Sequence, residues 1–98
     1  MFSHMVPDTS KAAIGARLAA VRRARAISSG AMATAMKMTP QRWSNYEQGR
    51  NVPPPEVLSK FWQITGATAD YVLFGRMDGL PNELYEVLLK KTDLEQSA

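Results

Sequence analysis

The sequence predicts an all-α fold, a compact bundle of five or six short helices. Apolar residues recur every three or four positions, as on one face of a helix, and a residue suited to cap a helix precedes most of these patterns. No segment shows the sustained alternation with β-branched residues that is typical of a strand. The 98 residues are enough for one domain with a single core.

Two serines mark the start of the first two helices, because a serine side chain can accept a hydrogen bond from a free N–H group of the first turn. We expect one helix from Ser10 to about Ala26 and another from Ser28 to about Met36. Each has an apolar face at helical spacing: Ile14, Leu18 and Val21 in the former, and Met32, Ala33 and Met36 in the latter.

The most informative part of the sequence is a short helix predicted between Thr39 and Gly49. Thr39 suits the N-cap, Pro40 fits the first helical position, and Gly49 can adopt the left-handed conformation that ends a helix. Trp43 and Tyr46 can face a core. The polar residues on the outward side are Gln41, Arg42, Ser44 and Asn45. Glutamine and asparagine can bind base edges, and arginine and serine can bind phosphates or bases, so this pattern predicts a DNA recognition helix.

Prolines, glycines and a threonine cap predict the next two helices. The three prolines at 53–55 deny backbone donors and fix an extended path, and the last of them begins a helix that Gly66 ends. The residues expected on its inward face are Leu58, Phe61, Trp62 and Thr65. Thr68 is suited to cap a short helix at 69–74, which Gly75 closes.

A last helix is predicted from Pro81, fading into a polar tail at residues 92–98. Its apolar face consists of Leu84, Val87 and Leu88. Such a face must be covered, either by the core of the same chain or by a second copy. Residues 77–98 are therefore a candidate dimerisation element. We expect Trp62 to lie in the core, and the alternative is that it lies in a dimer interface.

The charge is distributed unevenly along the chain. Residues 1–50 carry eight Lys or Arg and two acids, a formal charge of +6, whereas residues 51–98 carry four and seven, a charge of −3. This asymmetry indicates one side that faces a polyanion and another turned away from it. Arg23 and Arg25 lie off the apolar stripe of their helix, and we expect both to be solvated.

Composition argues against several other classes of protein. The chain has no cysteine, which excludes disulfides and thiolate metal sites and is typical of a cytosolic protein. We find no apolar run long enough to span a membrane and no signal peptide. The single histidine, His4, is expected to be solvated in a flexible tail at residues 1–9. No catalytic or metal-ligating arrangement is present, so we expect neither an enzyme nor a cofactor.

Several segments match one known family in both order and spacing. They are residues 14–18, 27–28, 32–33, 43–50, 54, 58 and 70–75. The sequence resembles the phage repressor/Cro-type helix-turn-helix family, also called the XRE family, over about residues 11–76. The resemblance implies a lambda-repressor-like DNA-binding domain at residues 10–76, whose helix at 39–48 lies in the major groove of double-stranded DNA.

The resemblance also assigns roles to individual positions. The positions at which the family reads bases are Pro40, Gln41, Ser44 and Asn45. The positions at which the family touches phosphate are Ser29, Lys37, Arg42, Arg50 and Asn51. Arg22 and Glu47 match a structural ion pair that braces the recognition helix against the first helix.

Four residues depart from the family pattern. Gly30 is one of them, and it lowers the helix propensity of the predicted second helix by about 1 kcal/mol relative to alanine. Ser29 stands where the family has a longer glutamine that binds phosphate. Pro40 replaces a polar base-reading residue and can offer only apolar contact, for instance to a thymine methyl group. Trp62 replaces a small residue. We therefore expect a sequence preference different from that of better-known relatives.

The sequence thus predicts a cytoplasmic, nucleoid-associated transcriptional regulator, a repressor, that binds double-stranded DNA as a homodimer. Two alternatives remain open. The fold could belong to an antitoxin that neutralises a partner protein through its acidic C-terminal half. It could also belong to a protein-interaction adaptor whose DNA binding is degenerate, as the changes at Ser29 and Pro40 would allow.

Overall fold

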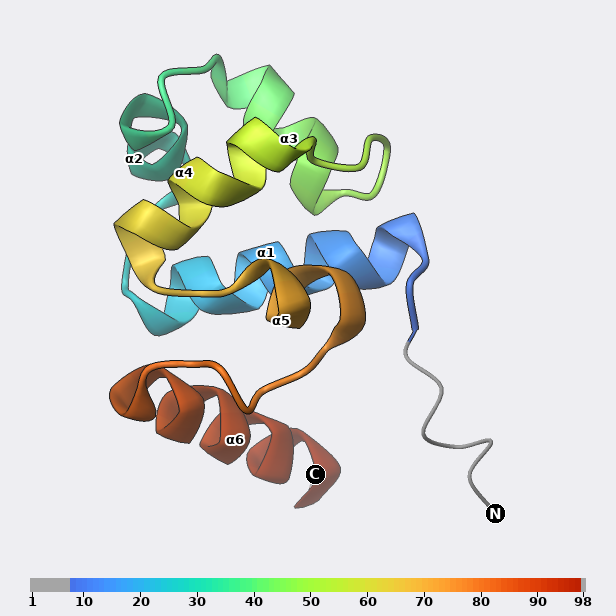
Figure 1. Ribbon diagram of the computed structural model, residues 1–98, viewed down its shortest axis with the longest axis vertical. Helices are drawn as coiled ribbons and strands as arrows, with labels where there is room; N and C mark the ends of the chain where they lie inside the picture. Colours follow the sequence, from blue (N-terminus) through green and yellow to red (C-terminus); the bar gives the residue numbers. More distant parts are fainter. Residues whose placement is uncertain (1–7, 98) are drawn as a thin grey trace.

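The computed structural model describes the backbone of residues 8–97 and the side chains of residues 8–90. This part of the chain contains helices and no strand, which confirms the predicted all-α fold. The helices are α1 (Lys11–Ala24), α2 (Ser29–Ala35), α3 (Pro40–Glu47), α4 (Pro55–Thr65), α5 (Ala69–Phe74) and α6 (Asn82–Ser97) (Figure 1). Most of the predicted flexible tail at 1–9, including His4, lies outside the described residues.

Side-chain caps begin four of the helices. In each, the hydroxyl of the N-cap accepts a hydrogen bond of 3.1 Å from the N–H group three residues further on. The four caps are Ser10, Ser28, Thr39 and Thr68. These are the capping residues that the sequence predicted, so the start of each helix was encoded locally.

The first three helices end in the same type of turn. The residue after the C-cap is left-handed, with φ of 57° at Ala26, 57° at Lys37 and 78° at Gly49. The next N–H group then donates back to a carbonyl of the last helical turn, as from Ile27 to Arg22 at 3.0 Å. Only the third of these turns contains the glycine that usually marks such an ending.

Two predicted helix boundaries are wrong. The first helix ends at Ala24 rather than near Ala26, because its left-handed turn uses an alanine and is not visible in the sequence. The last helix continues to Ser97 instead of fading at residues 92–98. Polar residues do not by themselves end a helix, and no glycine or proline follows Pro81.

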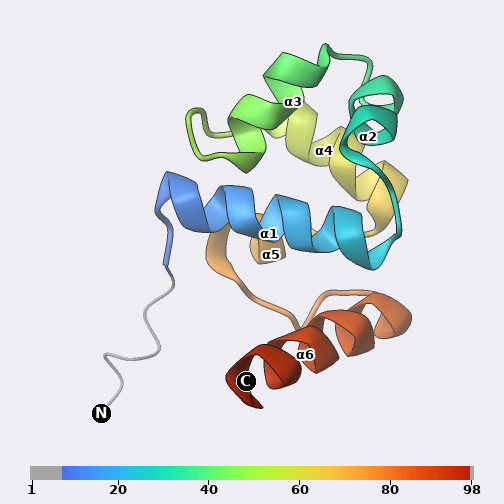
Figure 2. The ribbon, with the colours of Figure 1, turned by 180° about the vertical axis from the view of Figure 1, so that it is seen from behind.

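Helix α1 lies at the centre of the molecule. It packs against α3, α5 and α6, and α2 packs against α3 (Figures 1 and 2). The indole of Trp43, fully buried, stacks on Phe61 with ring centroids 5.7 Å apart and meets the edge of Tyr46. The core therefore joins the predicted recognition helix to α4 through aromatic contacts.

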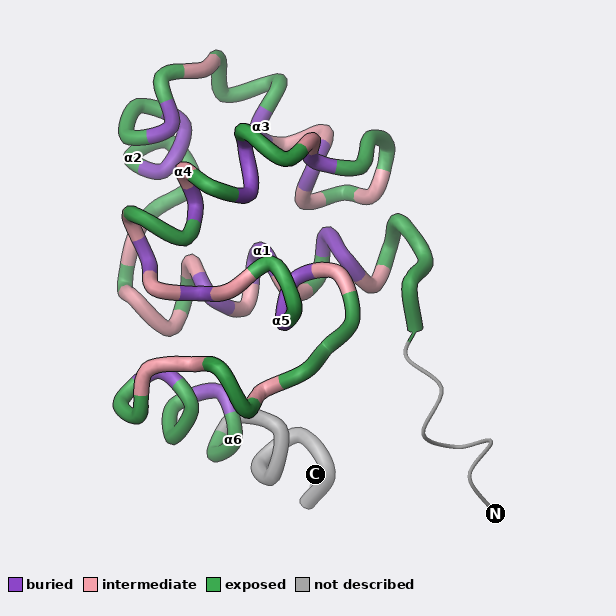
Figure 3. The backbone as a smooth tube through the Cα atoms, viewed as in Figure 1, coloured by how far each residue is buried: buried purple, intermediate pink, exposed green. Residues whose placement is uncertain are grey.

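Helix α6 contributes to this same core. Leu84 and Leu88 are buried in it, whereas Val87 is exposed. Figure 3 shows the buried positions of α6 on its side toward α1. The chain itself therefore covers most of the apolar face that we considered for dimerisation.

The prediction that Arg25 is a solvated charge is wrong. Its Nε donates to the carbonyl of Thr65 at 2.8 Å, and its guanidinium pairs with Glu83 at 3.3 Å. Arg25 thus ties the end of α1 to the end of α4 and to the start of α6. Arg23 is exposed, as expected.

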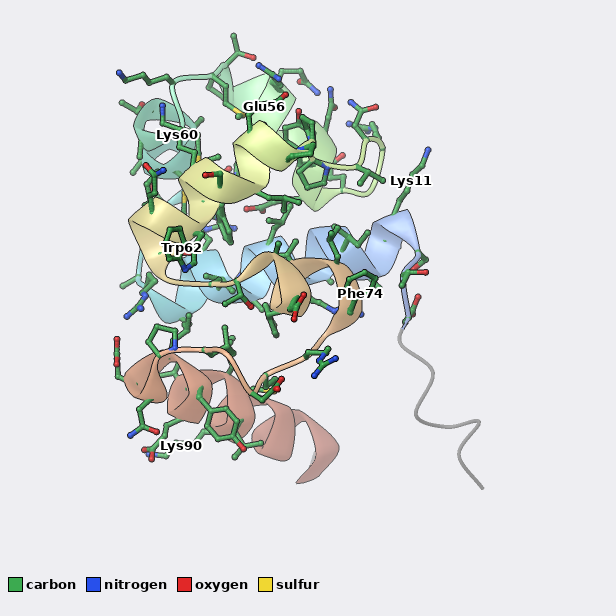
Figure 4. All side chains as sticks on the ribbon, in the orientation of Figure 1. Lys11, Glu56, Lys60, Trp62, Phe74 and Lys90 are labelled. Atoms are coloured by element: carbon green, nitrogen blue, oxygen red, sulfur yellow. The ribbon has the colours of Figure 1, made fainter. Side chains whose placement is uncertain are left out.

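The predicted core position of Trp62 is also wrong. Its side chain is 53% exposed and lies on the outer side of α4 (Figure 4). The preceding residue, Phe61, is fully buried, and one step along a helix turns a side chain by about 100°. The two neighbouring aromatics therefore cannot both face the core.

Helices α1 and α3 approach each other closely at Gly15. A Cβ atom there would lie 2.6 Å from the backbone oxygen of Tyr46 and nearer still to that of Glu47. Only a residue without a side chain fits between the two helices at this point.

We expect Gly15→Ala to lower the free energy of unfolding by about 2 kcal/mol, because the added methyl group must push α3 away from α1. Urea denaturation would measure this change.

Gly30→Ala is the matched control. Nothing lies within 4 Å of a Cβ at this exposed position in α2, so we expect stabilisation of about 0.5–1 kcal/mol. A Gly15→Ala variant as stable as the wild type would contradict this account of the packing.

Candidate nucleic-acid interface

Helices α2 and α3 and the turn between them form one end of the molecule, and α6 forms the opposite end (Figure 1). In the turn, Lys37 is left-handed and the N–H of Met38 donates to the carbonyl of Ala33 at 3.0 Å. Met32 and Ala33 are buried where α2 packs against α3. This packing fixes the angle at which α3 leaves the turn.

A largely buried ion pair holds α3 against α1. The guanidinium of Arg22 contacts the carboxylate of Glu47 through Nε at 2.6 Å and through a second nitrogen at 3.2 Å. Both side chains are only 12% exposed. The same guanidinium donates to the carbonyl of Ile27, so it also holds the chain that leads into α2.

The indole of Trp43 joins this ion pair. Its Nε1 donates to Glu47 Oε2 at 2.6 Å, which satisfies the one polar atom of an otherwise buried aromatic side chain. Sequence reasoning assigned Trp43 to the core and did not anticipate this bond. The spacing of four residues within one helix was the available signal, because such residues are neighbours on its surface.

The residues predicted to contact DNA all remain accessible to solvent. Ser44 and Asn45 are partly exposed, and the others are exposed. These others are Ser29, Lys37, Pro40, Gln41, Arg42, Arg50 and Asn51. They come from α2, the turn, α3 and the loop that follows α3, which are consecutive elements at one end of the molecule (Figure 1).

Hydrogen bonds link several of these side chains. Asn45 Oδ1 accepts from Gln41 Nε2 at 3.0 Å and from a guanidinium nitrogen of Arg50 at 3.1 Å. Ser44 Oγ accepts from the amide of Gln48 at 2.8 Å. The outer face of α3 is therefore a set of paired polar groups rather than a row of independent side chains.

Lys11 is a cation at this end that sequence reasoning missed. The C-terminal turn of α3 rests on the first residues of α1, where a Cβ on Gly49 would come within 3.1 Å of the backbone of Lys11 and Ala12. The Lys11 side chain is exposed and extends beside the loop after α3 (Figure 4). Only the tertiary packing brings it there, since 39 positions separate Lys11 from Arg50 in the sequence.

The charges and donors of this end suit a polyanion. The side chains of Lys11, Lys37, Arg42 and Arg50 are all exposed.

The described residues contain no group of three histidine, cysteine or acidic side chains that could hold a metal ion. Within the same residues, no helix is long and apolar enough to cross a membrane.

A model of the helix-turn-helix domain family matches residues 13–72. The chain belongs to this family. The helix-turn-helix match begins inside α1 and ends inside α5, so it includes α2, the turn and α3. The resemblance inferred from the sequence is thus confirmed.

A solved structure gives a second comparison for this helix-turn-helix chain. The crystal structure of the clp gene regulator ClgR from Corynebacterium glutamicum has a similar fold, with a TM-score of 0.59 and 23% sequence identity. The similarity covers 88% of this chain and 83% of that one. A comparison with curated protein sequences gives no match.

We expect Glu47→Ala to lower the free energy of unfolding by about 3 kcal/mol, because it leaves the guanidinium of Arg22 largely buried without its counter-ion. Urea denaturation monitored by far-ultraviolet circular dichroism would measure the loss.

Asp78→Ala is the control for this variant. It breaks the ion pair between Asp78 and Arg76, in which the side chains are 75% and 60% exposed, so little or no change in the free energy of unfolding is expected. If the two variants destabilise the protein equally, the ion pair between Arg22 and Glu47 does not stabilise the packing of α3 against α1.

Proposed function

We propose that this protein is a sequence-specific transcriptional regulator, a repressor, that binds double-stranded DNA by laying α3 in the major groove. One observation carries the proposal. Helix α3 is fixed from inside by Trp43 and the Arg22–Glu47 pair, while its outer side carries amide and hydroxyl groups accessible to solvent. A rigid helix with exposed donors and acceptors is what reading of base edges requires.

In this proposal the charged residues around α3 bind the DNA backbone. Lys37 before α3, Arg42 on it and Arg50 after it would contact phosphates, and Ser29 and Asn51 would add hydrogen bonds. We add Lys11 to this set because of its position beside the loop after α3. Such contacts fix the register of the helix on the duplex without reading the sequence.

Base reading is assigned to the outward residues of α3, with Gln41 as the principal reader. Pro40 would contact apolar groups, and Ser44 would add a hydroxyl group. We propose a binding function and assign no catalytic role to these residues. Binding to chromosomal DNA would keep the protein in the cytoplasm, with the nucleoid.

Selection of bound sequences from a random DNA pool would test the proposal. The wild type is expected to enrich a two-fold-symmetric motif, and Gln41→Ala is expected to lose the preference at one base pair of each half-site. Arg42→Ala should weaken binding to all sequences alike, because a phosphate contact carries no sequence information.

Gln63→Ala provides a matched control, because this exposed glutamine lies on α4 instead of α3. A reporter promoter overlapping the selected motif should lose expression when the protein is present, as repression requires. If the wild type enriches no sequence, the antitoxin and adaptor hypotheses take precedence and the search moves to partner proteins.

We further propose that two copies bind DNA together, since one recognition helix reads only a few base pairs. The exposed Trp62 supports a contact between copies on α4. It borders an apolar groove lined by Pro55, Leu58, Ser59, Thr68, Ala69 and Leu73. A large aromatic side chain beside an apolar groove is typical of a protein interface.

Sedimentation velocity over a range of concentrations would test the dimer. We expect the wild type to dimerise and Trp62→Lys to remain monomeric with unchanged stability, because this side chain contributes little to the core. Phe74→Lys is the control, an exposed aromatic at a different site (Figure 4). A wild type that is monomeric at high micromolar concentration would rule the dimer out.

A further inference from the structure

The side chain of Asn45 is the centre of a hydrogen-bonded group on the outer face of α3. Its Oδ1 accepts from Gln41 Nε2, one helical turn earlier, and from Arg50 in the loop after the helix. The backbone N–H of Arg50 also donates to the carbonyl of Asn45 at 2.9 Å. Arg50 is therefore attached to Asn45 by both its backbone and its side chain.

The chemistry of arginine fixes the orientation of both amides. A guanidinium has only donors, so the Asn45 atom that faces Arg50 must be the amide oxygen. The Gln41 atom that faces this same oxygen must then be the amide nitrogen. The two hydrogen bonds use both lone pairs of Asn45 Oδ1.

Because both lone pairs of Asn45 Oδ1 are used, Asn45 and Gln41 differ in what they can bind, although the sequence predicted base reading for both. Bidentate binding of adenine requires an acceptor for its N6 amino group and a donor for its N7 on the same amide. Asn45 has no acceptor capacity left. Gln41 keeps its oxygen and one of the two hydrogens of its amide nitrogen, so it retains both an acceptor and a donor.

We propose that Gln41 is the adenine-reading side chain of this protein and that Asn45 is a positioning residue that holds it. This inference rests on the proposed function. Arg50 contributes by occupying the second lone pair of Asn45 Oδ1 and by fixing the orientation of the Asn45 amide. The sequence predicted that Asn45 reads a base itself, whereas in this proposal Asn45 acts by holding Gln41 in position.

The group also depends on how α3 ends. Gly49 adopts φ of 78°, which brings the chain back so that Arg50 lies next to Asn45. The turn rests on the start of α1, which fixes the position from which the Arg50 side chain begins. Positioning of Gln41 is therefore linked to the packing of the domain and not only to α3.

Sequence selection with three variants would test the inference. Gln41→Ala and Asn45→Ala are expected to lose preference for adenine at the same base pair, each by about fivefold or more. Asn45→Asp retains an oxygen that accepts from both Gln41 and Arg50. It should keep the preference for adenine while its negative charge weakens binding to all sequences.

Two results would overturn the inference while leaving the proposed function intact. One is relaxation by Asn45→Ala of a different base pair, which would mean that Asn45 reads a base itself. The other is an adenine preference unchanged by Asn45→Ala. A wild type that enriches no sequence would instead overturn the proposed function, and the adenine reading with it.

NMR of the free protein would test the hydrogen-bonded group without DNA. We expect the side-chain amide resonances of Gln41 to shift in Asn45→Ala and to shift much less in Asn45→Asp. The amide of Gln48, which donates to Ser44, is an internal control that should not move. Unchanged Gln41 resonances in Asn45→Ala would show that Asn45 does not hold this side chain.

Discussion

The ion pair between Arg22 and Glu47 is the interaction on which the rest of the structure depends. A charge pair this well covered stabilises a fold only if its remaining polar groups are satisfied. Here the indole of Trp43 and the carbonyl of Ile27 complete it. The pair joins α1 to α3 through the side chain of Glu47, whose backbone oxygen also lies against Gly15 of α1, so α3 is held to α1 at two places.

Fixing α3 from inside leaves its outer face free for another purpose. Side chains that need not stabilise the helix can be arranged for binding, and those on α3 are polar, accessible and linked in pairs. Hydrogen bonds between exposed groups contribute little to stability, but they restrict the rotamers of long side chains such as that of Gln41. Restricting them before binding lowers the entropic cost of contacting DNA.

The opposite end of the molecule has a different role. Arg25 caps the end of α4 and pairs with Glu83 at the start of α6, while Leu84 and Leu88 fill the core beneath α1. Helix α6 thus completes the domain and does not simply extend from it. The inner face of α6 is therefore occupied. Among the described residues, Trp62 on α4 is the most exposed large apolar side chain.

The sequence by itself determined the helix starts, most of the predicted core residues and the position of the helix proposed to read DNA, because caps, prolines and apolar spacing act over a few neighbouring residues. It failed at Ala26, where a helix ends without a glycine, and at Trp62, where a hydrophobic residue is exposed. Only the tertiary structure decided that Lys11 lies beside the loop after α3 and that Arg25 ties the end of α1 to α4 and α6. These arrangements depend on how separate elements pack, which no local pattern records.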